Sequence, residues 1–210
     1  MSGYLIGPSG VAPAVIVSSA TTWDGTTNIG PNITLSNGNL TALLGTSGVN
    51  GVLSLGNHLT GLYYAEFHLD TLGAAAVFIG IANTAETLNA QPGVGGANGI
   101  GWNINTGQVW FNGANPTNTP VAAGATGNTI SIATDLTNKK IWFRVGAGNW
   151  NNNASGDPTN SSGGFGADFG SIGAGPYYVK YAPQNASDQI TANFGGSAYL
   201  QSEPAGYGNW

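Results

Sequence analysis

The amino-acid sequence predicts an all-β fold, an antiparallel sandwich built from two sheets. Its apolar runs are short, often alternate with polar residues, and are separated by turns rich in Gly and Asn; Gly alone accounts for 35 of the 210 residues. No stretch of the sequence carries an apolar stripe at helical spacing over a dozen residues. Many short strands joined by tight turns, within the length of one domain, are typical of a β-sandwich.

Strands with a period of two are predicted from Ile33 onward. The first long strand covers residues 62–70. One face of it holds Tyr63, Ala65, Phe67 and Leu69, and the other holds Tyr64, Glu66, His68 and Asp70. A further strand over residues 76–82 places Val77, Ile79 and Ile81 on one face.

The remaining strands are predicted as hairpins and a closing pair. Residues 100–104 and 109–111 flank a turn at 105–108, and residues 128–135 and 140–145 flank a turn at 136–139. The closing strands cover residues 177–181 and 189–194. Residues 83–90 are the best helical candidate, with one or two turns at most. Residues 146–176 form the longest irregular stretch, and a loop of that length is usually functional or mobile.

Residues 1–21 are set apart from the domain predicted over residues 22–210. They contain no charged side chain and are interrupted repeatedly by Gly and Pro. A free tail of this apolar composition is a liability in water, so we expect it to pack. Two alternatives stay open: an edge strand of the same domain, or an arm that docks on a neighbouring subunit.

Composition excludes several classes of protein. Only 6% of residues are charged and the net charge is -5, which argues against nucleic-acid binding, because that binding draws on many Lys and Arg side chains. No Cys is present, and two His residues are too few for a three-His zinc site. The longest N-terminal apolar run, residues 11–17, contains Pro13 and lacks a basic flank, so we expect no export signal and no membrane insertion.

Catalytic motifs are weak throughout the chain. The carboxylates of Glu66 and Asp70 lie four residues apart on one strand face, roughly 13 Å at the rise of a β-strand, which is too far for a glycosidase pair. Glu86, or a partner on another strand, leaves a hydrolase open as the less favoured alternative. No nucleophile elbow or phosphate loop with its Lys is present. We expect no catalytic residue, cofactor or metal, although a cation between Asp157 and Asp168 remains an alternative.

Aromatic residues beside loops are the strongest signal for binding. In residues 140–145 the alternation turns Ile141, Phe143 and Val145 inward, and it turns Lys140, Trp142 and Arg144 outward. Trp and Asn side chains at such positions suit both sugar stacking and protein contacts. The candidate binding residues, led by Trp150, are Trp150, Asn151, Asn152, Asn153, Asp157, Trp142, Arg144 and Trp110.

Seven short motifs, in order, resemble those of SPRY (B30.2) domains. They are YYAEF at 63–67, FIGIA at 78–82, GIGWN at 99–103 with the later NG at 112–113, residues 130–143 with Asp135 and Phe143, GNW at 148–150, ANFG at 192–195 and PAGY at 204–207. The resemblance covers about residues 22–210. One departure is Asn128, which stands after Gly127 where the family has an Asp.

The resemblance implies a bent sandwich of the concanavalin A-like jelly-roll type that binds proteins, or occasionally other ligands, through loops at one end, without catalysis. The scarcity of charge and the abundance of Gly, Asn and Thr resemble SPRY-type domains of bacteriophage virion proteins. We therefore expect a structural or receptor-facing module of a head fibre, tail fibre or decoration protein on the virion surface. The N-terminal arm would attach to other virion proteins in a homo-oligomer. The alternative is a lectin-like module that binds host glycans.

Overall fold

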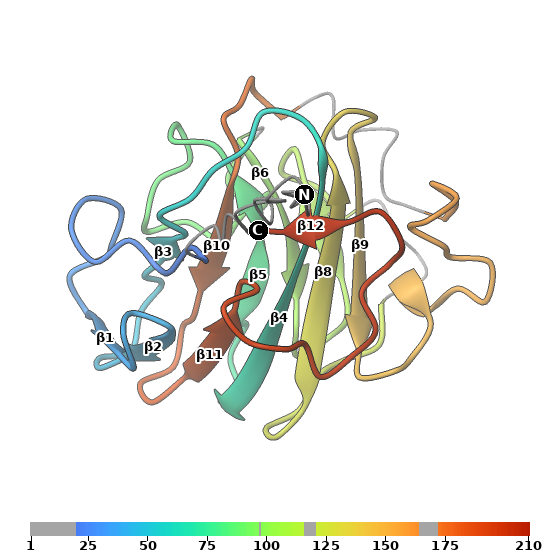
Figure 1. The fold of residues 1–210 in the computed structure, drawn as a ribbon. Coiled ribbons are helices and arrows are strands. Elements are labelled where there is room, and N and C mark those ends of the chain that lie inside the picture. The colour runs from blue at the N-terminus through green and yellow to red at the C-terminus, as the bar shows by residue number, and fades with distance from the viewer. Residues whose placement is uncertain (1–19, 97, 116–120, 164–171) are drawn as a thin grey trace, which may run out of the picture.

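The structure is a computed structural model that describes residues 20–96, 98–115, 121–163 and 172–210. Its twelve strands are β1 (Ile33–Ser36), β2 (Thr41–Leu44), β3 (Val52–Leu53), β4 (Leu62–Thr71), β5 (Phe78–Ala82), β6 (Gly99–Asn103), β7 (Val109–Phe111), β8 (Thr129–Asp135), β9 (Lys140–Val145), β10 (Tyr178–Ala182), β11 (Gln189–Asn193) and β12 (Gly208–Asn209). The described residues contain no α-helix, only one 3-10 turn, η1 (Trp150–Asn152). The predicted all-β class is confirmed (Figure 1).

The strands form two sheets. The seven-stranded sheet has the order β1-β2-β11-β4-β8-β9, and β12 pairs with β4 in addition. The five-stranded sheet has the order β3-β10-β5-β6-β7. All these pairs are antiparallel except β12–β4, which is parallel and uses the start of β4, where β11 no longer reaches. Strands β9 and β7 are therefore ends of their sheets.

Side chains at alternate positions fill the space between the sheets, as the period of two predicts. On β4, Ala65, Phe67 and Leu69 are buried in this core. The rings of Trp102 on β6 and Phe143 on β9 lie 5.6 Å apart and join the two sheets. Trp23 lies 5.9 Å from Phe67 and 5.1 Å from Phe194. Truncating a buried aromatic of this kind typically costs about 3–5 kcal/mol.

Several expectations differ from the structure. Residues 83–90 form turns and no helix, because a run this short has no room for a stable apolar stripe. Strands β3 and β12 were not predicted; each has only two residues and therefore no readable alternation. The question of an edge strand or an arm in residues 1–19 lies outside the described residues. Among those described, no helix is long and apolar enough to cross a membrane.

Candidate binding site

The outer face of β4, β8 and β9 carries a second buried cluster. Trp142 on β9 pairs with Ala133 on β8, and Ala133 pairs in turn with Tyr64 on β4. These three side chains, with Trp150 and Tyr207, form an apolar cluster on the side of the sheet away from the main core. The predicted alternation of residues 140–145 is confirmed, but the outward face is covered. Residues 150–163 and 195–207 lie over it, so Trp142 is completely buried.

Arg144 is held at the centre of this covered face. Its guanidinium donates to the Tyr64 hydroxyl at 3.2 Å and to the Ser202 carbonyl at 2.6 Å. Its Cζ lies 4.2 Å from the centre of the Trp150 ring, which gives a cation–π contact in a site of low exposure. Arg144 thus ties the sheet to both covering segments, and it does not face a partner from outside.

Glu66 holds the second covering segment. Its carboxylate accepts from the Tyr64 hydroxyl and from the backbone amides of Leu200 and Gln201, each at 2.7 Å. Burial raises the pKa of Tyr64 to about 12, and the hydrogen bond to Glu66 adds to this, so the phenol stays a donor. The three bonds satisfy the buried Glu66 carboxylate and fix the segment that carries Leu200 and Gln201.

Asn151 connects the loop after β9 to the open edge of that strand. Its Oδ1 accepts from the Phe143 amide at 2.8 Å, and its Nδ2 donates to the carbonyls of Ile141 at 3.4 Å and Gly163 at 2.7 Å. The side-chain amide thereby continues the hydrogen bonding of β9, which is the last strand of its sheet among the described residues. Asn151 is buried and adopts a left-handed conformation, with φ of 51°.

Further bonds fix the rest of this loop. The Trp142 indole donates to the Ser162 carbonyl at 2.8 Å, the Lys140 ammonium donates to the Ser161 carbonyl, and the Tyr207 hydroxyl donates to the Pro158 carbonyl. Trp150, the leading candidate, is only 8% exposed and packs beneath the loop. It supports the loop and presents little surface to a partner.

The exposed part of the loop is uncharged and polar. We call four of its exposed residues the polar tip: Asn152, Asn153, Thr159 and Asn160. Asp157 lies half-buried below it and accepts from the Thr159 amide at 2.9 Å and from the Asn160 side chain. The candidate cation ligand Asp168 lies outside the described residues. Within those described, no group of three His, Asp or Glu side chains could hold a metal ion.

The other predicted residues lie elsewhere. Trp110 is half-buried on β7, in the five-stranded sheet, whereas Trp142 is on β9 in the other sheet and Trp150 is in η1. The acids considered for hydrolysis are also not brought together. Glu86 lies beside Lys180 on the five-stranded sheet, whereas Glu66 and Asp70 lie on β4.

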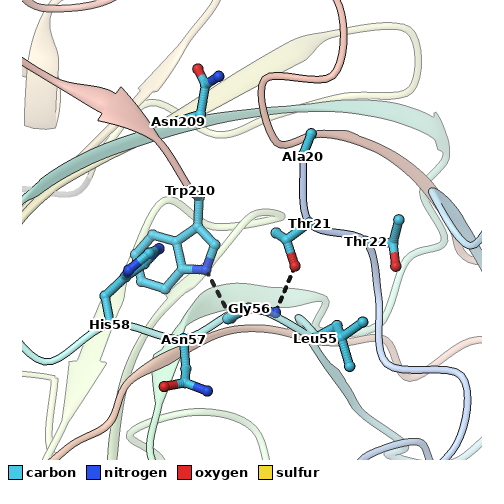
Figure 2. Close-up of a pocket in the computed structure, with 9 residues that line it drawn as sticks. All are labelled: Ala20, Thr21, Thr22, Leu55, Gly56, Asn57, His58, Asn209 and Trp210. Atoms are coloured by element: carbon cyan, nitrogen blue, oxygen red, sulfur yellow. Dashed lines mark hydrogen bonds between the residues drawn. The ribbon is translucent and has the colours of Figure 1, made fainter. Parts of the chain in front are cut away.

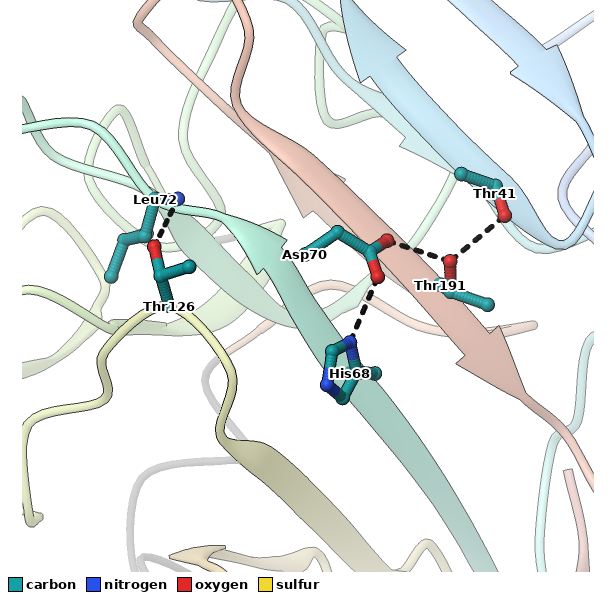
Figure 3. A network of polar contacts seen from close by, with 6 residues as sticks. All are labelled: Thr41, His68, Asp70, Leu72, Thr126 and Thr191. Atoms are coloured by element: carbon teal, nitrogen blue, oxygen red, sulfur yellow. Dashed lines mark hydrogen bonds and ion pairs between the residues drawn. The ribbon is translucent and has the colours of Figure 1, made fainter.

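Asp70 belongs to a separate polar network on the seven-stranded sheet (Figure 3). Its Oδ1 lies 2.8 Å from His68 Nδ1, and its Oδ2 accepts from the Thr191 hydroxyl at 2.6 Å. Thr41 lies 2.8 Å from Thr191 and extends the chain of bonds to β2. Within the described residues, the His68 ring bonds to the Asp70 carboxylate and to no hydroxyl. The network joins three strands through their outward side chains.

A pocket of 450 Å³ lies where the first and last described segments meet (Figure 2). We call it the Trp210 pocket; its lining is Ala20, Thr21, Thr22, Leu55, Gly56, Asn57, His58, Asn209 and Trp210. The Trp210 indole donates to Ser54 Oγ at 3.2 Å and to the Gly56 carbonyl at 3.3 Å. Sequence reasoning missed this pocket, because its walls come from three segments far apart in the chain.

Comparison with known proteins identifies the fold. No protein-family model matches the sequence, and no curated protein matches it. The SPRY domain of human HERC1 matches in structure at 13% identity and a TM-score of 0.58, over 76% of this chain and 91% of that one. The PSpry domain of TRIM65 matches at 13% identity and a TM-score of 0.59, over 83% of this chain and 92% of that one. A human SPRY domain matches at 11% identity and a TM-score of 0.53, over 80% of this chain and 98% of that one. The chain has the fold of SPRY domains, as its motifs predicted.

Proposed function

We propose that the chain is a non-enzymatic binding module that contacts its partner through the polar tip. The observation that carries this proposal is the construction of the loop. Its base is buried and bonded to β9 through Asn151 and Trp142, while its outer side chains are exposed and uncharged. A surface held rigidly before binding loses little conformational entropy when a partner arrives.

The same geometry favours a protein over a glycan as the partner. Sugar stacking needs an exposed aromatic face, but Trp142 is fully buried and Trp150 is 8% exposed. The amide and hydroxyl groups of the tip suit hydrogen bonds with peptide groups. The resemblance to SPRY domains, which bind proteins, supports the same choice. A lectin-like module is the second candidate, and a glycan hydrolase is the least favoured.

We further propose that this module belongs to a bacteriophage virion, as part of a head fibre, tail fibre or decoration protein on the particle surface. The support is compositional. With 6% charged residues, many copies can pack side by side with little mutual repulsion. The N-terminal arm would attach the module to other virion proteins, and the module would form a homo-oligomer. Capsid and tail genes beside its gene are the expected finding; a neighbourhood without them contradicts the virion assignment.

The binding role is tested with two matched double variants. Asn152→Asp/Asn153→Asp places charge on the polar tip with little change in side-chain shape. Asn32→Asp/Asn37→Asp makes the same change at exposed positions elsewhere, and Asn37 shares the left-handed conformation of Asn152. The purified chain is measured by surface plasmon resonance against the purified head and tail proteins of its gene neighbourhood, and against immobilised glycans.

We expect the tip variant to bind a virion protein at least about tenfold more weakly, which is about 1.4 kcal/mol. The control variant should bind as the unmodified chain does. Equal binding by the two variants would contradict the polar tip as the contact surface. Binding to a glycan and to no protein would contradict the protein partner and favour the lectin-like module.

A further inference from the structure

The Trp210 pocket has apolar side chains exposed at its edge. Leu55, which lines it, is 59% exposed, and Leu59 in the same loop is 61% exposed. They are two of the three large hydrophobic side chains that are exposed among the described residues; the third is Leu200. An exposed leucine beside a hollow is typical of a surface that another segment covers.

The walls of the pocket are uncharged side chains. His58 is the one titratable side chain among them, and burial lowers its pKa, so it stays neutral at physiological pH. Its ring stacks on Tyr63 at 3.6 Å, and its Nε2 has no hydrogen-bond partner among the described residues. Such a pocket suits an uncharged apolar segment with a free backbone polar group, and it does not suit a charged ligand.

The chain itself supplies a segment of that chemistry at the pocket. Residues 1–19 carry no charge, and their apolar side chains are densest at 11–17, the run VAPAVIV. Ala20 lines the pocket, and the Gly56 amide donates to Thr21 Oγ at 2.6 Å, which fixes the point where this segment joins the domain (Figure 2). Val17 precedes Ala20 by three residues, at most about 10 Å of extended chain.

We propose that residues 11–19 dock into the Trp210 pocket of their own chain, against Leu55. Because the segment is covalently joined at the pocket, its effective concentration there is of the order of mM, far above that of a second copy in solution. When residues 11–19 dock, residues 1–10 remain outside the pocket, and their fully extended length is about 33 Å. This inference does not rest on the assignment to a virion or on the polar tip.

Cross-linking in the full chain tests the proposal, because the natural sequence contains no Cys. The double variant Val15→Cys/Leu55→Cys is treated with a short bismaleimide. The matched control, Val15→Cys/Leu200→Cys, places the second thiol at the other exposed leucine, outside the Trp210 pocket. Intact mass and gel mobility distinguish a bridge within one chain from a bridge between two chains.

We expect the Leu55 pair to give a bridge within one chain, at least about tenfold faster than the Leu200 pair, with a rate that does not depend on protein concentration. Equal rates for the two pairs overturn docking at this pocket. Bridges between chains, at a rate that rises with concentration, overturn docking in the same chain and assign the pocket to a second copy.

Hydrogen exchange supplies a second measurement without cysteines. Amides of residues 11–19 in the unmodified chain should exchange at least about tenfold more slowly than in Leu55→Ser/Leu59→Ser. The variant Leu200→Ser should leave their exchange unchanged. Free exchange in the unmodified chain, or equal exchange in both leucine variants, contradicts the proposal.

Discussion

At the scale of single residues, Lys180 is the most unusual side chain in the described structure. It is completely buried on β10, where its ammonium donates to the Thr87 carbonyl at 2.6 Å. Burial lowers its pKa to about 8, although the negative charge of Glu86 works in the opposite direction. Burial also raises the pKa of Glu86. Lys180 and Glu86 hold the turns of residues 83–96 against the outer face of the five-stranded sheet.

We predict that the free energy of unfolding increases as the pH rises from about 8 towards 10, because folded Lys180 loses its proton in this range. The unfolded chain keeps this proton until its pKa near 10.4, whereas the folded chain releases it near 8, so the unfolded state binds more protons in between. The free energy of unfolding should rise by at most about 1.4 kcal/mol per pH unit. Above pH 10 the trend reverses, because burial raises the pKa of Tyr64 to about 12 and the unfolded tyrosine ionises first.

Urea unfolding followed by tryptophan fluorescence at a series of pH values measures this dependence. The control is Lys180→Met, which has no titrating group and a similar length. Its stability should show no rise between pH 8 and 10. If Lys180→Met shows the same rise as the unmodified chain, another group is responsible.

At the scale of elements, most strands were predictable, but the two-residue strands β3 and β12 and the segments that cover the sheets were not. The alternation in β9 correctly placed Trp142 and Arg144 on the outward face. It did not indicate that residues 150–163 and 195–207 cover that face, because those contacts come from Asn, Ser and Pro in irregular segments without periodicity. The same holds for Asn151, whose residue type suggested an exposed loop rather than a cap on a strand edge.

We predict that Asn151→Ala destabilises the protein more than Asn152→Ala does. Both residues adopt φ of 51°, so both substitutions carry the cost of a left-handed Ala, roughly 1–2 kcal/mol. Only Asn151 also leaves the Phe143 amide and its other partners unbonded, which adds about 1–3 kcal/mol. Midpoints of urea unfolding compare the two variants. Equal losses would mean that the side chain of Asn151 does not stabilise the edge of β9.

At the scale of the whole molecule, the sandwich consists of two sheets with an additional layer on the outside of each. The turns of residues 83–96 over Lys180 form one layer, and residues 195–207 over Glu66 and Arg144 form the other. The SPRY motifs predicted the two sheets because five of the seven lie in or extend into strands. The outer layers depend on contacts between distant residues, such as Glu66 with Leu200, which no local pattern reveals.

We predict that residues 195–207 open as a unit when Glu66 is changed to Gln. A neutral amide can accept through one oxygen only, whereas the Glu66 carboxylate accepts from Leu200, Gln201 and Tyr64. Losing such a bond costs about 1–3 kcal/mol, and the loss falls on a segment outside the core. Hydrogen exchange should therefore quicken in residues 195–207 while β4 and β8 keep their protection. Asp70→Asn, the same change on the same strand face, should leave this segment unchanged, because Asp70 bonds to His68 and Thr191 instead. If exchange in Glu66→Gln quickens equally throughout the sandwich, the outer layer and the core unfold together.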